Sequence, residues 1–233
     1  MPAPQAVLFD AYGTLFDVYS VGQLAETLFP GQGPALAALW RDKQIEYTRL
    51  VTTSNDGAHY QPFWTLTRAA LRFAIKKLAG SEESALAAAR FDSKIERLMD
   101  AYRRLACFPD AKPLLETLRA RGVATGILSN GDPQMLADAV QSSGIGGLLD
   151  HVLSVDAVRK YKTHREAYAL GEQATGLPAG QILFVSSNSW DALGATWYGY
   201  RTLWVNRQRL PFEELGTEPS RIGTSLGDVL AFF

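Results

Sequence analysis

The residues best suited to chemistry are two aspartates and a lysine that follow apolar runs of sequence. Asp10 ends the run at 6–9, Asp191 comes shortly after the run at 182–185, and Lys162 follows a further apolar run. A carboxylate can act as a nucleophile or as a base, and a neighbouring ammonium group can balance its charge. This set of residues therefore indicates chemistry based on a carboxylate nucleophile.

Further polar side chains follow predicted strands in the same way. Ser129 and Asn130 come directly after an apolar run at 123–128, and Ser186 and Asn188 follow the run at 182–185. Each residue alone also fits an ordinary turn, and Lys162 alone fits a solvated surface charge. Because the carboxyl ends of parallel strands share one edge of a sheet, four successive strand ends of this kind favour a common site.

The elements that must position these residues fall into two regions. The region 18–104 is patterned for helices, with apolar residues at three- and four-residue spacing in 35–50, 64–78 and 84–105. A loop is expected at 52–57, and no strand pattern separates the helices. This pattern is typical of a small helical bundle.

From residue 108 onward, strand and helix patterns alternate. Short apolar runs at 123–128, 151–155, 182–185 and 202–205 predict strands, and Asp132-Pro133 predicts the start of a helix. Such alternation indicates a parallel sheet with helices on both faces.

The first strand has to join this later sheet, because alone it could not bury its apolar residues. We therefore predict an α/β fold, a Rossmann-like doubly wound parallel sheet formed by residues 1–17 and 105–233. Residues 18–104 form a helical cap inserted after the first strand.

The composition of the chain limits the kinds of partner that we expect. The 233 residues are 47% hydrophobic and 20% charged with a formal net charge of −1, which argues against nucleic acid as a partner. No apolar run reaches the ~20 residues of a membrane span, and no secretory signal is apparent. The single cysteine, Cys107, has no nearby histidine or glycine turn, so we interpret it as a structural thiol. We predict a cytoplasmic protein with no membrane partner.

Four segments, taken in order, resemble the motifs of the haloacid dehalogenase superfamily. They are DAYGTL at 10–15, SNG at 129–131, YK at 161–162 and FVSSNSWD at 184–191. The first and last of them resemble most closely the (S)-2-haloacid dehalogenase branch, and LWR at 39–41 is similar to that branch's arginine segment. The resemblance covers the whole chain.

The resemblance implies hydrolysis of short (S)-2-haloalkanoic acids to (R)-2-hydroxy acids and halide. Asp10 would attack C2 of the substrate to form an aspartyl ester, with Thr14 orienting its carboxylate. Water oriented by Asp191, with help from Lys162, Ser186 and Asn188, would then hydrolyse the ester. The partners implied are the 2-haloacid, the halide ion and a second copy of the chain in a homodimer.

The resemblance also implies how substrate and halide are bound. Ser129 and the backbone N–H groups of Ala11 and Tyr12 would hold the substrate carboxylate. Arg41 and Asn130 would receive the halide, and Tyr168 would hydrogen-bond within the site. The apolar wall would consist of Tyr12, Ile45, Tyr60 and Trp190.

We expect no metal or other cofactor. Tyr12 replaces the acid/base aspartate that the superfamily's phosphatases carry, and Ser186 stands where a metal-binding carboxylate would be expected. Halide needs no protonation as it leaves. Two alternatives stay open, a metal-dependent phosphatase and a non-catalytic anion-binding protein on the same scaffold.

Three positions depart from the family pattern. Asp42 follows Arg41 where relatives carry a neutral amide, and an extra carboxylate there would oppose anion binding. Tyr60 adds a hydroxyl to an aromatic position. Thr163 replaces a common proline, and Thr163-His164-Arg165-Glu166 predicts a capping box at the start of the next helix.

Overall fold

The computed structural model describes residues 2–79 and 85–233, and the chain divides into two compact units. The core unit is Met1–Asp17 with Ala106–Phe233, and the cap unit is Val18–Leu105. None of the helices in the described residues is both long and apolar enough to cross a membrane.

The core unit contains a six-stranded, fully parallel sheet in the order β3-β2-β1-β4-β5-β6. The strands are β1 Ala6–Phe9, β2 Ala124–Ser129, β3 His151–Ser154, β4 Ile182–Ser186, β5 Arg201–Val205 and β6 Arg221–Gly223. The predicted doubly wound sheet is confirmed, and β6 at its edge is an additional strand that the sequence pattern did not indicate.

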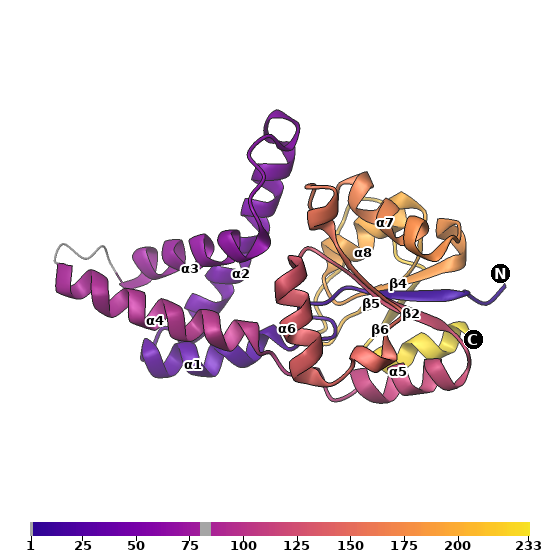
Figure 1. Ribbon diagram of the computed structural model, residues 1–233, viewed down its shortest axis with the longest axis horizontal. Coiled ribbons are helices and arrows are strands. Elements are labelled where there is room, and N and C mark those ends of the chain that lie inside the picture. The colour runs from indigo at the N-terminus through magenta and orange to yellow at the C-terminus, as the bar shows by residue number, and fades with distance from the viewer. Residues whose placement is uncertain (1, 80–84) are drawn as a thin grey trace. The chain divides into compact units, whose positions relative to one another are not determined.

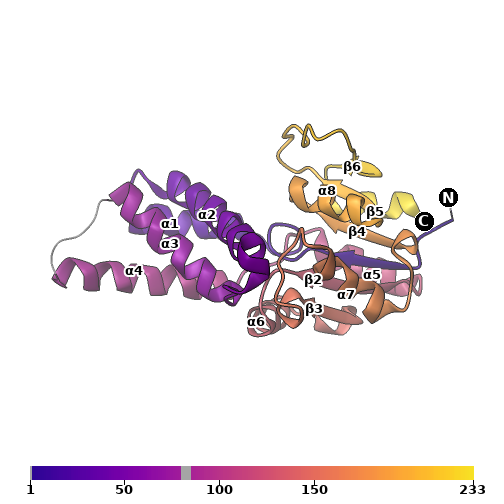
Figure 2. The same ribbon diagram turned by 90° about the horizontal axis from the view of Figure 1, so that it is seen from above.

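The first strand occupies the centre of this sheet. All four residues of β1 are buried, and it pairs with β2 on one side and β4 on the other. The chain runs outward through β2 and β3, then returns to β4 and runs outward again through β5 and β6 (Figures 1 and 2). The order therefore reverses between β1 and β4, the point at which open α/β sheets place their binding sites.

Helices cover both faces of the sheet. The core helices are α5 Ala111–Ala120, α6 Pro133–Ser143, α7 Arg165–Thr175 and α8 Ser189–Tyr198, with 3-10 segments η3 Gly146–Leu148, η4 Val155–Ala157, η5 Ala179–Gln181 and η6 Leu226–Phe232. In Figure 1, α7 and α8 lie on one face, and α5 with η6 lies on the other.

Two core helices begin after a side-chain cap, one as predicted and one not. Asp132 Oδ1 accepts a hydrogen bond from the backbone N–H of Met135 at 3.1 Å, which confirms the start of α6. The capping box expected from Thr163 is wrong, because His164 is the N-cap of α7 and its Nδ1 accepts from Glu166 N–H. The Thr163 side chain packs against Gly194 of α8 instead.

The described residues of the cap unit form helices joined by short loops, with no strand among them. The helices are η1 Val18–Ser20, α1 Val21–Leu28, α2 Gly33–Thr53, η2 Ser54–Gly57, α3 Phe63–Ala79 and α4 Ala85–Arg103. Leu36, Trp40, Leu71 and Leu98 are among its buried residues. The three predicted helical segments are confirmed; residue 84, the expected start of the last one, lies outside the described residues.

Candidate active site

Asp10 directly follows the central strand β1 and leads into a tight turn. The carbonyl of Ala11 accepts hydrogen bonds from the N–H groups of Leu15 and Phe16, both at 2.9 Å. Gly13 has φ of +92°, a conformation that residues with a side chain rarely adopt. This turn brings the Thr14 hydroxyl back to Asp10.

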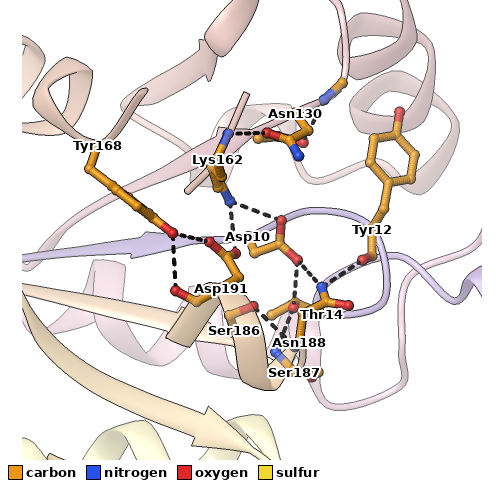
Figure 3. Close-up of polar contacts among 12 residues, drawn as sticks. Asp10, Tyr12, Thr14, Asn130, Lys162, Tyr168, Ser186, Ser187, Asn188 and Asp191 are labelled. Carbon is orange, nitrogen blue, oxygen red and sulfur yellow. Dashed lines mark hydrogen bonds and ion pairs between the residues drawn. The ribbon is translucent and has the colours of Figure 1, made fainter. Parts of the chain in front are cut away.

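Both oxygens of the Asp10 carboxylate are bound by donors (Figure 3). Oδ2 accepts from Thr14 Oγ1 at 3.0 Å and from Asn188 Nδ2 at 2.8 Å. Oδ1 accepts from Lys162 Nζ at 3.1 Å. The Asp10 side chain is 8% exposed. The carboxylate is therefore fixed in orientation while retaining a small exposed surface.

Lys162 lies between two carboxylates. Its Nζ donates to Asp10 Oδ1 and to Asp191 Oδ2, the latter at 2.9 Å, and lies 4.8 Å from the centre of the Phe184 ring. The residue is 1% exposed. Burial by itself would lower the lysine pKa, but the charges of the two aspartates raise the pKa above its usual value. Lys162 is therefore a cation that joins the two carboxylates.

Asp191 and Tyr168 form the buried end of this network. Burial raises the pKa of Asp191 to about 6, against the lowering effect of Lys162. Tyr168 Oη donates to Asp191 Oδ1 at 2.8 Å. Burial and the nearby Asp191 charge raise the pKa of Tyr168 well above its usual value, so Tyr168 keeps its proton and acts as the donor.

The loop after β4 holds the other side of Asp10. Asn188 is the residue before α8, but its side chain makes no capping bond to that helix; it donates to Asp10 and to the Tyr12 carbonyl instead. Ser186 Oγ accepts from the backbone N–H of Asn188 at 3.1 Å. The backbone N–H of Ser187 donates to Thr14 Oγ1 at 2.8 Å. The loop is thus directed toward the carboxylate.

Ser129 and Asn130 lie at the carboxyl end of β2. Asn130 Oδ1 accepts from the backbone N–H of Lys162 at 3.0 Å, which leaves its Nδ2 group to donate elsewhere. Ser129 Oγ accepts from Gly131 N–H at 3.0 Å and is fully buried. A Cβ at Gly131 would lie 2.7 Å from the Tyr12 ring, so glycine makes room for that ring.

The structure joins most of the predicted core residues in one network. Asp10, Thr14, Lys162, Tyr168, Asn188 and Asp191 are linked by direct side-chain contacts. Ser186, Asn130 and Tyr12 are attached to it through backbone groups. Ala11 is buried in the same turn, and Trp190 is half-buried in the first turn of α8.

Three contributors were not predicted. Phe184 lies beneath the Lys162 ammonium group, and Ser187 holds Thr14 through its backbone. Tyr200 Oη donates to the carbonyl of Tyr168 at 2.5 Å. Phe184 and Ser187 lie inside the motif 184–191, which could have suggested them, whereas no sequence signal marks Tyr200.

The cap residues of interest lie on or just after α2. Arg41 Nη1 donates to Gln44 Oε1 at 2.6 Å, and both belong to α2. Asp42 is exposed, whereas Ile45 and Tyr60 are half-buried.

The arrangement suits a carboxylate nucleophile with a second carboxylate nearby. One oxygen of each carboxylate, Oδ1 of Asp10 and Oδ2 of Asp191, binds the same Lys162 ammonium group. Within residues 2–79 and 85–233, no group of three or more His, Cys, Asp or Glu side chains could hold a metal ion. Burial raises the pKa of Cys107, which is opposite to what a thiolate nucleophile requires.

The chain combines a doubly wound sheet with an inserted helical unit, and a carboxylate lies where the strand order reverses. These features define an α/β enzyme whose sheet core carries an inserted helical cap. The model of the haloacid dehalogenase-like hydrolase family matches residues 4–199. The chain belongs to this family.

Individual relatives are similar over nearly the full chain. This chain is 44% identical to the (S)-2-haloacid dehalogenase of Pseudomonas sp. (strain YL), and the match covers 98% of this chain and 94% of that protein. A crystal structure of the L-2-haloacid dehalogenase RSc1362 has a TM-score of 0.92 and 52% identity, covering 99% and 98%. An L-2-haloacid dehalogenase from Xanthobacter autotrophicus with chloropropionic acid covalently bound has a TM-score of 0.84 and 34% identity, covering 97% and 96%.

Proposed function

We propose that this protein is an (S)-2-haloacid dehalogenase, which hydrolyses short (S)-2-haloalkanoic acids to (R)-2-hydroxy acids and halide. The observation that carries the proposal is the Asp10 carboxylate, fixed by Thr14 and Asn188 and joined through Lys162 to Asp191. The alternatives of a phosphatase and of a non-catalytic anion-binding protein are not favoured, since the relatives similar over the full chain are haloacid dehalogenases.

In the first step, an oxygen of Asp10 attacks C2 of the substrate, and the carbon–halogen bond breaks as the new carbon–oxygen bond forms. The halogen leaves with the bonding electron pair, so no proton donor is required. Attack from the side opposite the halogen inverts C2 and produces an aspartyl ester.

In the second step, water attacks the carbonyl carbon of the Asp10 ester. Asp191 accepts a proton from that water and passes it to the leaving oxygen as the ester carbon–oxygen bond breaks, so the product leaves with its hydroxyl group. The other proton of the water is released as Asp10 returns to its carboxylate form. Lys162, Ser186 and Asn188 help to orient the water and Asp10. One turnover in labelled water is expected to place the label in Asp10 rather than in the product.

We assign substrate recognition to the groups that the family's motifs imply. Ser129 with the backbone N–H groups of Ala11 and Tyr12 holds the substrate carboxylate. Asn130 and Arg41 receive the halide. The Asn130 role is supported by its amide, whose oxygen is already bound to the Lys162 backbone and whose Nδ2 remains a donor. Trp190, Tyr12, Ile45 and Tyr60 supply apolar contact to the substrate.

The proposed reaction needs no metal, because Lys162 supplies the positive charge between Asp10 and Asp191. The test is a halide-release assay with both enantiomers of 2-chloropropionate, with and without EDTA, using Asp10→Asn as the inactive control. We expect release from the S enantiomer in both conditions and none from the variant. No release from any two- or three-carbon haloacid would contradict the function, and loss of activity in EDTA would contradict metal independence.

We also propose that the enzyme works in the cytoplasm as a homodimer. The single cysteine, Cys107, is compatible with a reducing compartment. Tyr19 and Leu50 are large, exposed hydrophobic residues of the cap unit that a second copy could cover. Light scattering coupled to size exclusion measures the oligomeric state, and a monomer at micromolar concentration would contradict the dimer.

A further inference from the structure

Arg41 is attached to a buried hydrogen-bond network inside the cap unit. Its guanidinium donates to Gln44 Oε1 at 2.6 Å. Gln44 Nε2 in turn donates to Thr67 Oγ1 at 2.6 Å and to Tyr102 Oη at 3.3 Å. Gln44, Thr67 and Tyr102 are all buried, and they come from three different helices, α2, α3 and α4. A neutral amide therefore connects Arg41 to the interior of the helical bundle.

The orientation of the Gln44 amide is set by the direction of these hydrogen bonds. The Thr67 hydroxyl donates its proton to the Phe63 carbonyl at 2.7 Å, so it can only accept from Gln44. Gln44 must then point its NH₂ group at Thr67 and its carbonyl oxygen at Arg41. The opposite orientation would place NH₂ against the guanidinium, two donors facing each other.

The Thr67 end of this chain is itself fixed. Thr67 lies on α3, and its backbone carbonyl accepts from Trp40 Nε1 at 2.8 Å. Trp40 is buried and directly precedes Arg41 on α2. The side chain of the residue before Arg41 and the amide that binds the Arg41 side chain are thus both held by one residue of α3.

We infer that Gln44 is a positioning residue that orients the Arg41 guanidinium without placing a negative charge beside it. A carboxylate in the same position would also hold Arg41, but it would cancel most of the charge that a halide or haloacid requires. The carbonyl oxygen of an amide fixes the direction of the guanidinium without adding a negative charge. This inference rests on the proposed role of Arg41 in receiving halide.

The decisive experiment is a double-mutant cycle between Gln44→Met and Arg41→Ala, measured as kcat and KM for (S)-2-chloropropionate and as inhibition by chloride. Methionine keeps the length and removes the acceptor. A hydrogen bond to a charged group is worth about ten- to hundredfold in such comparisons, so Gln44→Met should lower kcat/KM by about that factor. In the Arg41→Ala background the same substitution should have no further effect.

A second variant tests the charge. Gln44→Glu keeps an acceptor at the same place and adds a negative charge beside Arg41. We expect KM to rise and chloride inhibition to weaken. Thermal stability should fall as well, because a carboxylate offers no donor to Thr67 Oγ1. Glu46→Gln, at an exposed position of the same helix and paired with Lys43, is the matched control and should leave KM and the chloride inhibition constant unchanged.

If Gln44→Met does not fold, Thr67→Val removes the acceptor for Gln44 Nε2 at constant shape and should weaken chloride inhibition in the same direction. The inference is overturned if Gln44→Met lowers kcat/KM equally in both backgrounds, or leaves it unchanged while Arg41→Ala abolishes activity. An Arg41→Ala variant with full activity refutes the proposed role of Arg41 instead. Absence of halide release by the parent protein would contradict both the proposed function and this inference.

Discussion

The two units differ in the polar contacts of their interiors. In the core unit, Lys162 forms buried ion pairs with Asp10 and Asp191, while a further pair, Arg207–Asp110, is partly exposed. The cap unit keeps three ion pairs at least partly exposed: Lys43–Glu46, Arg68–Glu96 and Arg72–Asp92. Inside the cap, the buried polar contacts that connect α2 with α3 and α4 are neutral, through Gln44, Thr67 and Tyr102.

The difference follows from what each unit has to present. A buried ion pair stabilises a fold little, because desolvation offsets most of the attraction. Under the proposed function, the core has such pairs because a carboxylate nucleophile and a carboxylate base both need a counter-charge when they are out of water. The proposed role of the cap requires only that Arg41 is held in one direction, and the Gln44 dipole does this without adding a negative charge.

The largest expected effect comes from breaking the buried pairs of the core. Lys162→Met leaves Asp10 and Asp191 buried without a cation, and removing one partner of a buried pair costs about 3–5 kcal/mol. We expect a clear fall in the melting temperature at pH 7 and loss of halide release. Thermal unfolding followed by circular dichroism measures the first, and the release assay measures the second.

The pH dependence of the stability of Lys162→Met distinguishes the loss of a charge from the loss of packing. Asp191, whose pKa is about 6, becomes neutral in acid, so the stability difference from the parent should shrink as the pH is lowered. Lys112→Met, on the exposed face of α5, is the matched control and should unfold like the parent at every pH. A Lys162→Met variant as stable as the parent at pH 7 would show that the two carboxylates do not depend on this lysine.

A smaller effect is expected at the buried end of the same network. Asp191 acts as a base only when ionised, and its pKa of about 6 predicts that kcat falls as the pH drops through about 6. The Tyr168 hydrogen bond lowers the pKa of Asp191, so Tyr168→Phe should raise that pKa and move the acid limb to higher pH, by about one unit. The measurement is kcat against pH.

Tyr200→Phe provides the control for this shift. Tyr200 donates to the backbone carbonyl of Tyr168 and not to Asp191, so its removal should leave the acid limb in place. Equal shifts in both variants would indicate a general loosening of the aromatic cluster around Tyr168. An unmoved limb in Tyr168→Phe would mean that the limb belongs to another group.

The sequence predicted the parts of the site that depend on topology. Asp10, Lys162 and Asp191 follow strands whose carboxyl ends must share an edge, and their contacts follow from that placement. It did not predict β6, whose three residues are too few for a periodic pattern. It also placed a cap on Thr163 that His164 provides, because the side chain of Thr163 is taken up by packing against Gly194.

Contacts that depend on how helices pack or on backbone donors could not be predicted from the sequence either. Gln44 lies three residues after Arg41, a spacing that permits contact on a helix, but its partners Thr67 and Tyr102 are set by how α3 and α4 pack. Ser187 acts through its backbone N–H, which every residue except proline carries. The type of residue at these positions therefore does not indicate either contact.

The smallest expected effect lies on the surface of the cap and completes the comparison. Arg68 of α3 and Glu96 of α4 form a partly exposed pair, and that hydrogen bond lowers the pKa of Glu96 from its usual value. A lowered carboxyl pKa means that the stabilisation is present above pH 4.5 and is lost as the pH falls through the folded-state pKa. Glu96→Gln should therefore cost about 0.2–1 kcal/mol at pH 7, and the difference should vanish in acid and in high salt. Chemical unfolding at low and high salt measures it. A loss as large as that of Lys162→Met would mean that the cap, like the core, depends on its ion pairs for stability.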